Sequence, residues 1–529
     1  MGINVANDFD TVDRHARLIR ALCRPAAHVP PVARVELVET HISWVLLAGS
    51  HAYKIKKPVN LGFLDFSTLQ RRRFFCEEEV RLNRRLAPDL YLGVVPITGS
   101  FDAPRIGGDT EPLEYAVAMR RFPQQALLTH QPLDNTLIDA LAERVARFHL
   151  GLQPAPADSP FGTPEAALGP MRENFAHVRA GVDNPHVLHS LAQLERWTES
   201  CYRRVRGPLE KRRRDGFIRE CHGDLHRGNI AVVDGALTIF DCIEFSPQLR
   251  WIDTMSELAF LTMDLCEAGE TALARRLLNR YLQLTGDYAG LVVLPFYQVY
   301  RAMVRAKVIG IRLSQDDLSQ SERACACADL KKYLRLARML CRRQPPRLFI
   351  TCGLSGAGKT CLGNVLREHL PMIQISSDAE RKRLFGLSPC ARTNDGPGEG
   401  IYTPEAGRRT YARLAEMAAE IVAAGYSVLV DATFLTDAQR DPFRRLATHL
   451  GCPFTILALD APEAVLRQRI EERLAAGNQI SEADVGVLEL QLAAREPLRE
   501  DERSSTVFLD TTGPLDVAAL LERLGLAAS

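Results

Sequence analysis

The chain has 529 residues, of which 46% are hydrophobic and 25% are charged, so two to four globular domains are expected and disorder is excluded. Its formal net charge of +1 gives no overall attraction to nucleic acids or anionic membranes. No apolar run could span a bilayer, the N-terminus lacks a signal-peptide core, and the 13 cysteines form no paired C-x-x-C sets. These features predict a cytoplasmic protein with reduced thiols and no membrane partner.

The first part of the chain alternates apolar and polar residues, which is typical of strands. Strands are expected at 35–40, 44–47, 52–56 and 114–119, with a helix over 70–87 between the third and the fourth. Helical periodicity then dominates from about 133 to 205 and returns from 251 to 341. A strand-rich first part followed by a helical second part predicts an α+β fold of the two-lobed, protein-kinase-like type.

A polar segment between the helical stretches carries residues suited to phosphoryl transfer. It reads His-Gly-Asp-Leu-His-Arg-Gly-Asn from His222 to Asn229, and Asp241 follows twelve residues later, after an apolar run. Asp224 can accept the proton of an attacking hydroxyl, whereas Asn229 and Asp241 can hold Mg²⁺ on the phosphates of ATP. Such acids and amides in a loop have no role in a hydrophobic core, which favours a catalytic interpretation.

This segment resembles the catalytic segment of the aminoglycoside phosphotransferase family, the small-molecule relatives of protein kinases. The resemblance covers roughly residues 30–335 and implies a strand lysine that pairs with the α- and β-phosphates. Lys54 and Lys56 share one face of a strand, so the sequence does not separate them, and we prefer Lys54. The implied partner is a glutamate on the next helix. Of three consecutive glutamates there, Glu79 lies beside the apolar face and is our choice.

The sequence departs from that family at two points. No glycine-rich turn precedes the lysine strand, where Gly49 stands alone, and Asp241 is followed by Cys-Ile-Glu instead of a short D-F-G or D-x-E pattern. These departures leave open an alternative in which the first domain is a degenerate, nucleotide-sensing kinase fold.

The clearest domain boundary lies at Arg342-Arg343-Gln344-Pro345-Pro346. Two consecutive prolines cannot continue a helix, so a new domain is expected to begin near Arg347. We therefore expect a kinase-like domain over 1–342 and a second domain over 347–529.

The second domain opens with a phosphate-binding loop. An apolar run at 348–350 leads into a complete G-x-x-x-x-G-K-T motif, and a helix-like stretch follows at 361–370. The motif consists of Gly353, Leu354, Ser355, Gly356, Ala357, Gly358, Lys359 and Thr360. Its backbone N–H groups and the helix N-terminus can surround a phosphate, Lys359 can reach the β- and γ-phosphates, and the Thr360 hydroxyl suits Mg²⁺.

Strands and helices alternate after this loop, which predicts an α/β P-loop domain with a parallel sheet and ligands at the carboxyl ends of its strands. The pattern resembles P-loop kinases that phosphorylate hydroxyls, such as zeta toxins, gluconate kinase and the 5′-kinase part of polynucleotide kinase. In that group an Asp with an Arg three residues later acts as base and clamp, and Asp378 and Arg381 match this spacing. A helix N-cap is the alternative for Asp378. Asp431 ends a later strand and is expected near the metal and the acceptor.

The same resemblance implies arginines on a lid helix that neutralise charge in the transition state. Arg467, Arg469 and Arg473 are the candidates, and Arg469 and Arg473 share a helix face because they are four residues apart. Solvent-exposed helix charges are the alternative for each of them.

Together these features predict an ATP- and Mg²⁺-dependent phosphotransferase that acts on a hydroxyl of a small molecule and has two nucleotide sites. One alternative is a nucleotide-controlled regulatory or toxin–antitoxin-type module with one degenerate kinase domain. Another is a nucleic-acid 5′-hydroxyl kinase, which the near-neutral net charge disfavours. The sequence does not indicate the acceptor or the oligomeric state.

Overall fold

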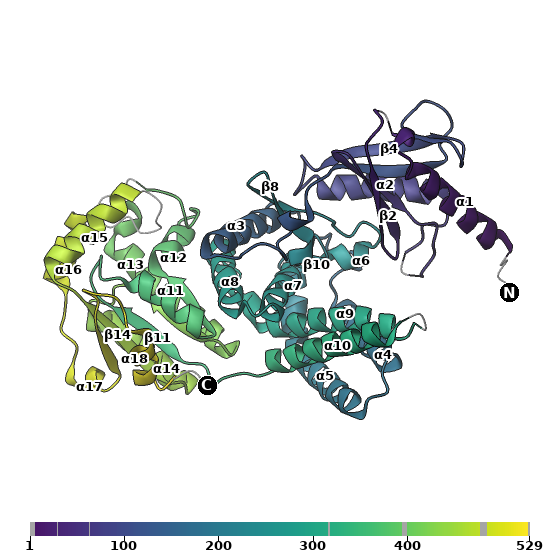
Figure 1. The fold of residues 1–529 in the computed structure, drawn as a ribbon. Coiled ribbons are helices and arrows are strands. Elements are labelled where there is room, and N and C mark those ends of the chain that lie inside the picture. The colour runs from purple at the N-terminus through teal and green to yellow at the C-terminus, as the bar shows by residue number, and fades with distance from the viewer. Residues whose placement is uncertain are drawn as a thin grey trace. The chain divides into compact units, whose positions relative to one another are not determined.

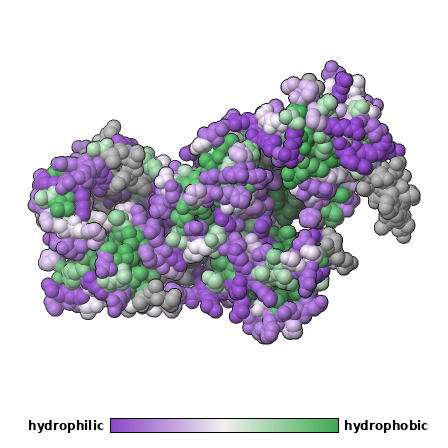
Figure 2. Space-filling view, viewed as in Figure 1, coloured by the Kyte–Doolittle hydropathy of each residue, from purple (hydrophilic) through white to green (hydrophobic). Residues whose placement is uncertain are grey.

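The computed structural model describes residues 6–28, 30–62, 64–315, 318–393, 399–476 and 484–526. The chain divides into two compact units (Figure 1). The first unit comprises Met1–Leu133, Gly151–Ala167 and Leu209–Asp264, and the second comprises Asp134–Leu150, Leu168–Pro208 and Leu265–Ser529. Within the described ranges no helix is both long and apolar enough to cross a membrane. Hydrophilic residues cover most of the face shown in Figure 2.

The first unit is built on an antiparallel sheet with the strand order β1-β2-β3-β6-β4-β5. Its strands are β1 (Val35–Glu39), β2 (Ser43–Ala48), β3 (His51–Lys56), β4 (Tyr91–Gly99), β5 (Pro104–Ile106) and β6 (Glu114–Arg120).

Two helices cover this sheet, α1 (Ala6–Leu22) and α2 (Leu69–Asn83). Leu18 of α1 shares a hydrophobic cluster with Ala116, whereas Val80 of α2 shares another with Val117. Since successive strand residues point to opposite faces, the two helices lie on opposite sides of the sheet. Lys54 and Lys56 therefore belong to the side covered by α2, because Ile55 between them lies in the α1 cluster.

The remainder of the first unit frames the polar segment around Asp224. Strand β7 (Ile218–Glu220) pairs with β10 (Trp251–Asp253), and β8 (Ile230–Val233) forms a hairpin with β9 (Ala236–Ile239). The helices here are α6 (Pro247–Arg250) and most of α7 (Thr254–Glu267). The loop between β7 and β8 is thereby held between two small ribbons.

The second unit contains helices and a parallel sheet. Its helices before the sheet are all or most of α3 (Asn135–Gly151), α4 (Pro164–Ala180), α5 (Pro185–Arg214), α8 (Thr271–Thr285), α9 (Leu294–Leu313) and α10 (Gln320–Leu340). The sheet has the order β12-β13-β11-β14-β15, and every pairing in it is parallel. Its strands are β11 (Leu348–Cys352), β12 (Met372–Ser376), β13 (Ser427–Asp431), β14 (Phe454–Asp460) and β15 (Thr506–Asp510).

The helices that alternate with these strands are α11 (Lys359–His369), α12 (Ser377–Leu384), α13 (Pro404–Ala423), α14 (Asp437–Leu450), α15 (Glu463–Ala476), α16 (Val485–Ala494), α17 (Glu500–Arg503) and α18 (Val517–Arg523). Phe349, Leu429 and Leu457 on the three central strands are buried in one cluster with residues of α11 and α15. Figure 1 shows α11 to α14 beside the sheet, as in an α/β layered fold. The fold class expected from the sequence is confirmed: an α+β kinase-like part, whose sheet is antiparallel, is followed by a parallel α/β part.

Candidate active sites

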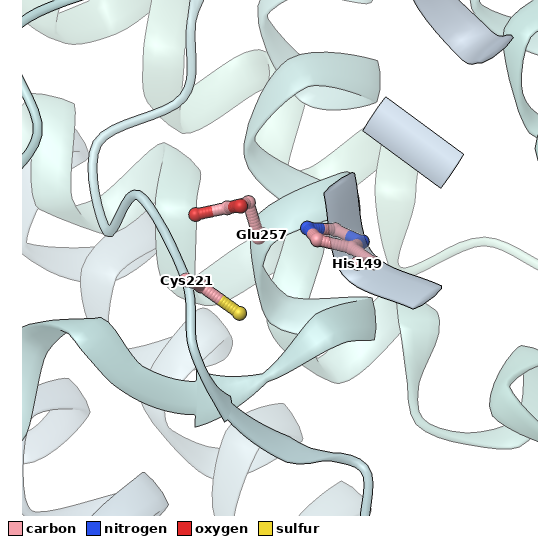
Figure 3. A group of neighbouring side chains, drawn as sticks. All are labelled: His149, Cys221 and Glu257. Carbon is pink, nitrogen blue, oxygen red and sulfur yellow. The ribbon is translucent and has the colours of Figure 1, made fainter. Parts of the chain in front are cut away.

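The loop that carries Asp224 has a backbone shape that only glycine allows. Gly223 has a φ of 92°, and a Cβ at this position would lie 2.8 Å from the Leu249 carbonyl oxygen. The Gly223 N–H donates to Glu257 Oε1 at 2.7 Å. Figure 3 shows the Glu257 carboxylate extending from α7 toward the loop that carries Cys221, and the ligand atoms of these two residues lie within 4.8 Å of each other. Glu257 thus fixes the backbone immediately before Asp224.

Asp224 itself is held by the last residue of the same motif. Asn229 Nδ2 donates to the Asp224 carbonyl oxygen at 2.9 Å and to its Oδ2 at 3.1 Å. The Asp224 side chain keeps 37% of its surface exposed, so an acceptor can reach it from solvent. His226 Nε2 lies 3.4 Å from Asp224 Oδ2. A positioned, accessible carboxylate of this kind is what a general base for a hydroxyl requires.

Asp241 lies two residues after the end of β9, in a left-handed backbone conformation with a φ of 65°. The Phe240 N–H donates to the Asn229 carbonyl oxygen at 3.0 Å, which joins the segment after β9 to the loop that carries Asp224. The Asp241 N–H donates to the Tyr91 hydroxyl at 3.1 Å, and Lys54 Nζ lies 2.6 Å from Asp241 Oδ1. A non-glycine residue in this conformation is uncommon, and such positions concentrate at functional sites.

The oxygen donors of this loop fit a magnesium ion. Because Asn229 turns its Nδ2 toward Asp224, its Oδ1 points away from that carboxylate. Asp241 contributes a carboxylate that is 45% exposed. Amide and carboxylate oxygens are the ligands that Mg²⁺ prefers. Asn229 and Asp241 are thus the residues of the first site that would hold it.

The lysine face of β3 forms a buried charge cluster. Glu79 pairs with both lysines: its Oε2 accepts from Lys56 Nζ at 2.8 Å, and its Oε1 lies 2.8 Å from Lys54 Nζ. Lys56 also pairs with Glu244, and Lys54 with Asp241. Lys56 and Glu79 have no exposed side-chain surface. From the sequence we chose one of the two lysines. In the structure both lysines pair with Glu79, and Lys54 also pairs with Asp241.

The charges in this cluster shift each other's pKa values. Burial alone would raise the pKa of Glu79, but the two ammonium groups of Lys54 and Lys56 lower it to about 2. Burial raises the pKa of Glu244, and Lys56 only partly offsets this effect. Three carboxylates share two lysines here, and Glu79 is the one that contacts both. Sequence analysis noted the glutamate after Asp241 only as a departure from a known pattern.

The phosphate loop connects β11 to α11 in the second unit. Gly356 and Gly358 have φ values of 82° and 85°, and a Cβ on Gly356 would lie 2.7 Å from the Leu466 carbonyl oxygen. Lys359 Nζ donates to the carbonyl oxygens of Gly353 and Leu354, at 3.0 and 2.7 Å. Burial lowers the pKa of Lys359, and the carboxylates of Asp431 and Asp378 oppose that shift. The lysine thus lies along the loop whose N–H groups can surround a phosphate.

Asp431 lies next to the loop at the carboxyl end of β13. Thr360 Oγ1 donates to Asp431 Oδ2 at 2.8 Å, and Gln374 Nε2 donates to the same oxygen at 3.0 Å. Burial raises the pKa of Asp431, while Lys359 lowers it. A threonine hydroxyl and a carboxylate side by side are hard oxygen donors that fit Mg²⁺. Sequence analysis did not identify Gln374, because nothing in its local sequence marks it.

Asp378 and Arg381 lie on α12, which follows β12. Arg381 Nη1 lies 3.2 Å from Asp378 Oδ1, and its guanidinium lies 5.0 Å from the centre of the Tyr402 ring. The N-cap of this helix is Ser376, so the interpretation of Asp378 as an N-cap is wrong. Tyr402, which the sequence did not single out, joins the residues around the proposed clamp.

The three arginines of α15 that the sequence suggests as lid residues have different surroundings. Arg469 donates to the carbonyl oxygens of Gly356 and Thr511, at 3.4 and 2.5 Å, so it supports the phosphate loop from its backbone side. Burial lowers the pKa of Arg473, and the nearby Asp378 carboxylate acts in the opposite direction. Arg467 pairs with Glu463 and Glu489 on the surface, as expected for a solvent-exposed helix charge.

Comparisons with known proteins match two separate regions of the chain to two families. Residues 68–292 match the model of a family described as "Phosphotransferase enzyme family", and residues 348–498 match one described as "AAA domain". The chain is 31% identical over 488 residues to the uncharacterized protein Rv2004c of Mycobacterium tuberculosis and, equally, to the uncharacterized protein Mb2027c of Mycobacterium bovis. These alignments cover 91% of this chain and 93% of each relative.

Two solved structures are similar to different parts of the chain. A gluconokinase from Sinorhizobium meliloti 1021 is 24% identical, with a TM-score of 0.24, and the match covers 35% of this chain and 98% of that one. Amicoumacin kinase hAmiN, solved in complex with AMP-PNP, Ca²⁺ and Ami, is 14% identical with a TM-score of 0.40. That match covers 62% of this chain and 96% of the other.

Proposed function

The chain belongs to the family of these mycobacterial proteins and joins a phosphotransferase-type kinase domain to a P-loop kinase domain, and on this basis we propose that it is an ATP- and Mg²⁺-dependent phosphotransferase with two nucleotide sites. The acceptor is a hydroxyl group of a small molecule. The observation that carries the proposal is the phosphate loop, with Thr360 and Lys359 next to the buried Asp431. This arrangement supports binding of a nucleoside triphosphate with its metal.

In the first site, Asp224 receives the proton of the acceptor hydroxyl as that oxygen attacks the γ-phosphorus. The bond between the γ-phosphorus and the β,γ-bridging oxygen breaks, and ADP leaves. Lys54, which Glu79 and Asp241 hold in place, is suited to the α- and β-phosphates. Asn229 and Asp241 would hold Mg²⁺, and the bound ion would neutralise negative charge on the phosphates. The accessible Asp224 carboxylate supports a base in this position.

In the second site, Lys359 and the backbone of Gly353–Thr360 hold the phosphates. Asp378 takes the proton of the acceptor hydroxyl, while Arg381 holds the acceptor or the transferred group. Arg473, near Asp378, compensates the negative charge that spreads over the transferred phosphoryl oxygens. The ion pair between Arg381 and Asp378 supports this assignment, since it orients the carboxylate.

A regulatory role for the first site is the second candidate. The turn before the lysine strand is Gly49-Ser50, with a single glycine at a φ of 59°, so backbone cover over the phosphates is reduced in comparison with a glycine-rich turn. In this case the first site would bind nucleotide and transfer no phosphoryl group.

Radiolabelled ATP and a metabolite library test the proposal directly. The full chain, Asp224→Ala, Lys359→Ala and the double variant are each incubated with ATP, Mg²⁺ and the library, and products that gain one phosphate are identified by mass spectrometry. Each product should depend on one of the two residues, and none should form with the double variant. Products that depend only on Lys359 favour the regulatory first site. A library that yields no phosphorylated product and no ATP turnover refutes the enzymatic proposal.

A further inference from the structure

A helix of the second unit covers the outer edge of its parallel sheet. Strand β12 is the outermost strand and pairs with β13 on its inner side. On its outer side, Asn279 of α8 donates from Nδ2 to the Met372 carbonyl oxygen at 3.0 Å and accepts from the Gln374 N–H at 2.8 Å. A residue of a parallel neighbouring strand bonds this same pair of groups. The Asn279 carboxamide thus takes the place of a further strand.

Asn279 is buried, and further hydrogen bonds hold its helix in place. Asn279 is 3% exposed, and its Nδ2 also donates to the Arg275 carbonyl oxygen of its own helix at 2.9 Å. Arg275 Nη1 donates to the Glu368 carbonyl oxygen at 3.0 Å, and Arg383 Nη2 donates to the Gln283 carbonyl oxygen at 2.5 Å. Helix α8 is therefore fastened to α11, β12 and α12 at separate points. An edge strand whose polar groups are paired in this way is fixed in position.

Strand β12, which Asn279 contacts, carries a side chain that bonds Asp431, the carboxylate proposed to bind the metal. Gln374, whose N–H bonds Asn279, sends its side chain to Asp431 Oδ2, the same oxygen that accepts from Thr360. Gly363 of α11 leaves space for this side chain, because a Cβ there would lie 2.5 Å from Gln374 Nε2. Three hydrogen bonds thus connect Asn279 to Thr360, by way of Gln374 and Asp431.

We propose that Asn279 is a positioning residue of the P-loop site: it fixes β12 so that Gln374 orients Asp431 beside Thr360. The inference rests on the proposed nucleotide binding at this loop. Helix α8 lies inside the segment that matches the phosphotransferase family, which ends at residue 292. The P-loop site consequently includes a residue that the kinase-like part of the sequence supplies.

The test measures Mg²⁺-dependent binding of a fluorescent ATP analogue to the full chain. All variants carry Asp241→Ala, which silences the metal site of the first unit. Asn279→Ala removes both hydrogen bonds to β12, and alanine preserves the helix because it is a strong helix former. Gln374→Leu removes the hydrogen bond to Asp431. Arg275→Ala is the matched control, since it loses a bond of the same helix to α11 that has no connection to Gln374.

Asn279→Ala should raise the half-saturating Mg²⁺ concentration about tenfold, as expected for the loss of hydrogen bonds that orient a ligand. Gln374→Leu should do the same, and the double variant should bind no more weakly than Gln374→Leu alone, because the two act in series. Arg275→Ala should stay within about twofold of the parent chain. Asn279→Asp, which keeps the size and the acceptor for the Gln374 N–H, replaces Asn279→Ala if that variant does not fold.

Three results would each overturn the positioning role. They are an unchanged Mg²⁺ dependence in Asn279→Ala, an equal effect of Arg275→Ala, and additive effects in the double variant. Lys359→Ala separates this failure from that of the proposed function. If Lys359→Ala leaves binding of the analogue intact, the loop is not the nucleotide site, and both proposals fall. If Lys359→Ala weakens binding while Asn279→Ala has no effect, only the role of Asn279 is wrong.

Discussion

Replacement of Glu79 by glutamine is expected to destabilise the first unit in a pH-dependent way. Glu79 is fully buried, and its pKa falls from 4.5 to about 2 because Lys54 and Lys56 both contact it. A shift of this size corresponds to roughly 3 kcal/mol of stability at neutral pH. This stabilisation comes from the two buried ammonium groups, each of which loses an anionic partner when Glu79 is replaced. We expect Glu79→Gln to lower the free energy of unfolding by roughly 3 kcal/mol at pH 7.

The sign of the pH dependence follows from the direction of the shift. A carboxylate whose pKa is lower in the folded state stabilises the fold fully above its unfolded pKa and loses that contribution as pH falls. For Glu79 the window runs from 4.5 down to about 2. The difference between the parent chain and Glu79→Gln should therefore shrink as pH is lowered through this window. Glu244 has a raised pKa and the opposite sign, so its contribution decreases as pH rises above 4.5.

The assay follows urea unfolding through the fluorescence of Trp44, which lies on β2 opposite Ile55 of β3. Trp197→Phe and Trp251→Phe remove the other two tryptophans, so that the signal reports the N-terminal sheet. Glu77→Gln is the control, because Glu77 forms a solvent-exposed pair with Arg73, and exposed pairs contribute little to stability. A loss in Glu79→Gln that equals the control, or that stays constant between about pH 3 and pH 7, would refute the reasoning.

Two further predictions concern the nucleotide sites. Lys359→Ala removes a charge-assisted phosphate contact worth about 1.5–3 kcal/mol, so calorimetry should show one of two ATP sites weakened at least tenfold, and unchanged titration of both sites would contradict the assignment. Asp241→Ala should abolish Mg²⁺-dependent nucleotide binding at the first site, whereas Asp224→Ala should spare binding and remove transfer, since a base acts only on the acceptor. Equal loss of ATP binding in both variants would show that these roles are wrong.

The sequence predicted the parts of the sites that lie within short motifs. The residues from Gly353 to Thr360 and from His222 to Asn229 could be placed because their spacing within a loop is itself the signal. Alternation and proline breaks were likewise sufficient to predict a strand-rich part, a helical part and a parallel sheet, and the structure confirms that order.

The residues that orient these motifs could not be predicted in the same way. Gln374 is separated from Asp431 by 57 residues, and Lys56 from Glu244 by 188. Both pairs depend on how strands and loops meet in space, and a glutamine or a lysine on a strand has no local feature that marks such a partner. The sequence could not distinguish Lys54 from Lys56 for a physical reason. Residues two apart on a strand share a face, and one glutamate can contact both.

The domain boundary expected near Arg347 was likewise inferred from local sequence, which does not reveal contacts between distant residues. Separate expression of 1–342 and 347–529 should give two soluble fragments that each melt cooperatively and are stabilised by ATP. Because 347–529 lacks α8, the Met372 carbonyl and the Gln374 N–H lose Asn279. The comparison is with the full chain carrying Asp241→Ala, in which the P-loop part keeps α8. ATP with Mg²⁺ should raise the melting temperature of the fragment less than it raises that of the P-loop part in this full chain. Equal shifts would show that the P-loop domain completes its site alone, and no shift in the fragment would show that it requires α8.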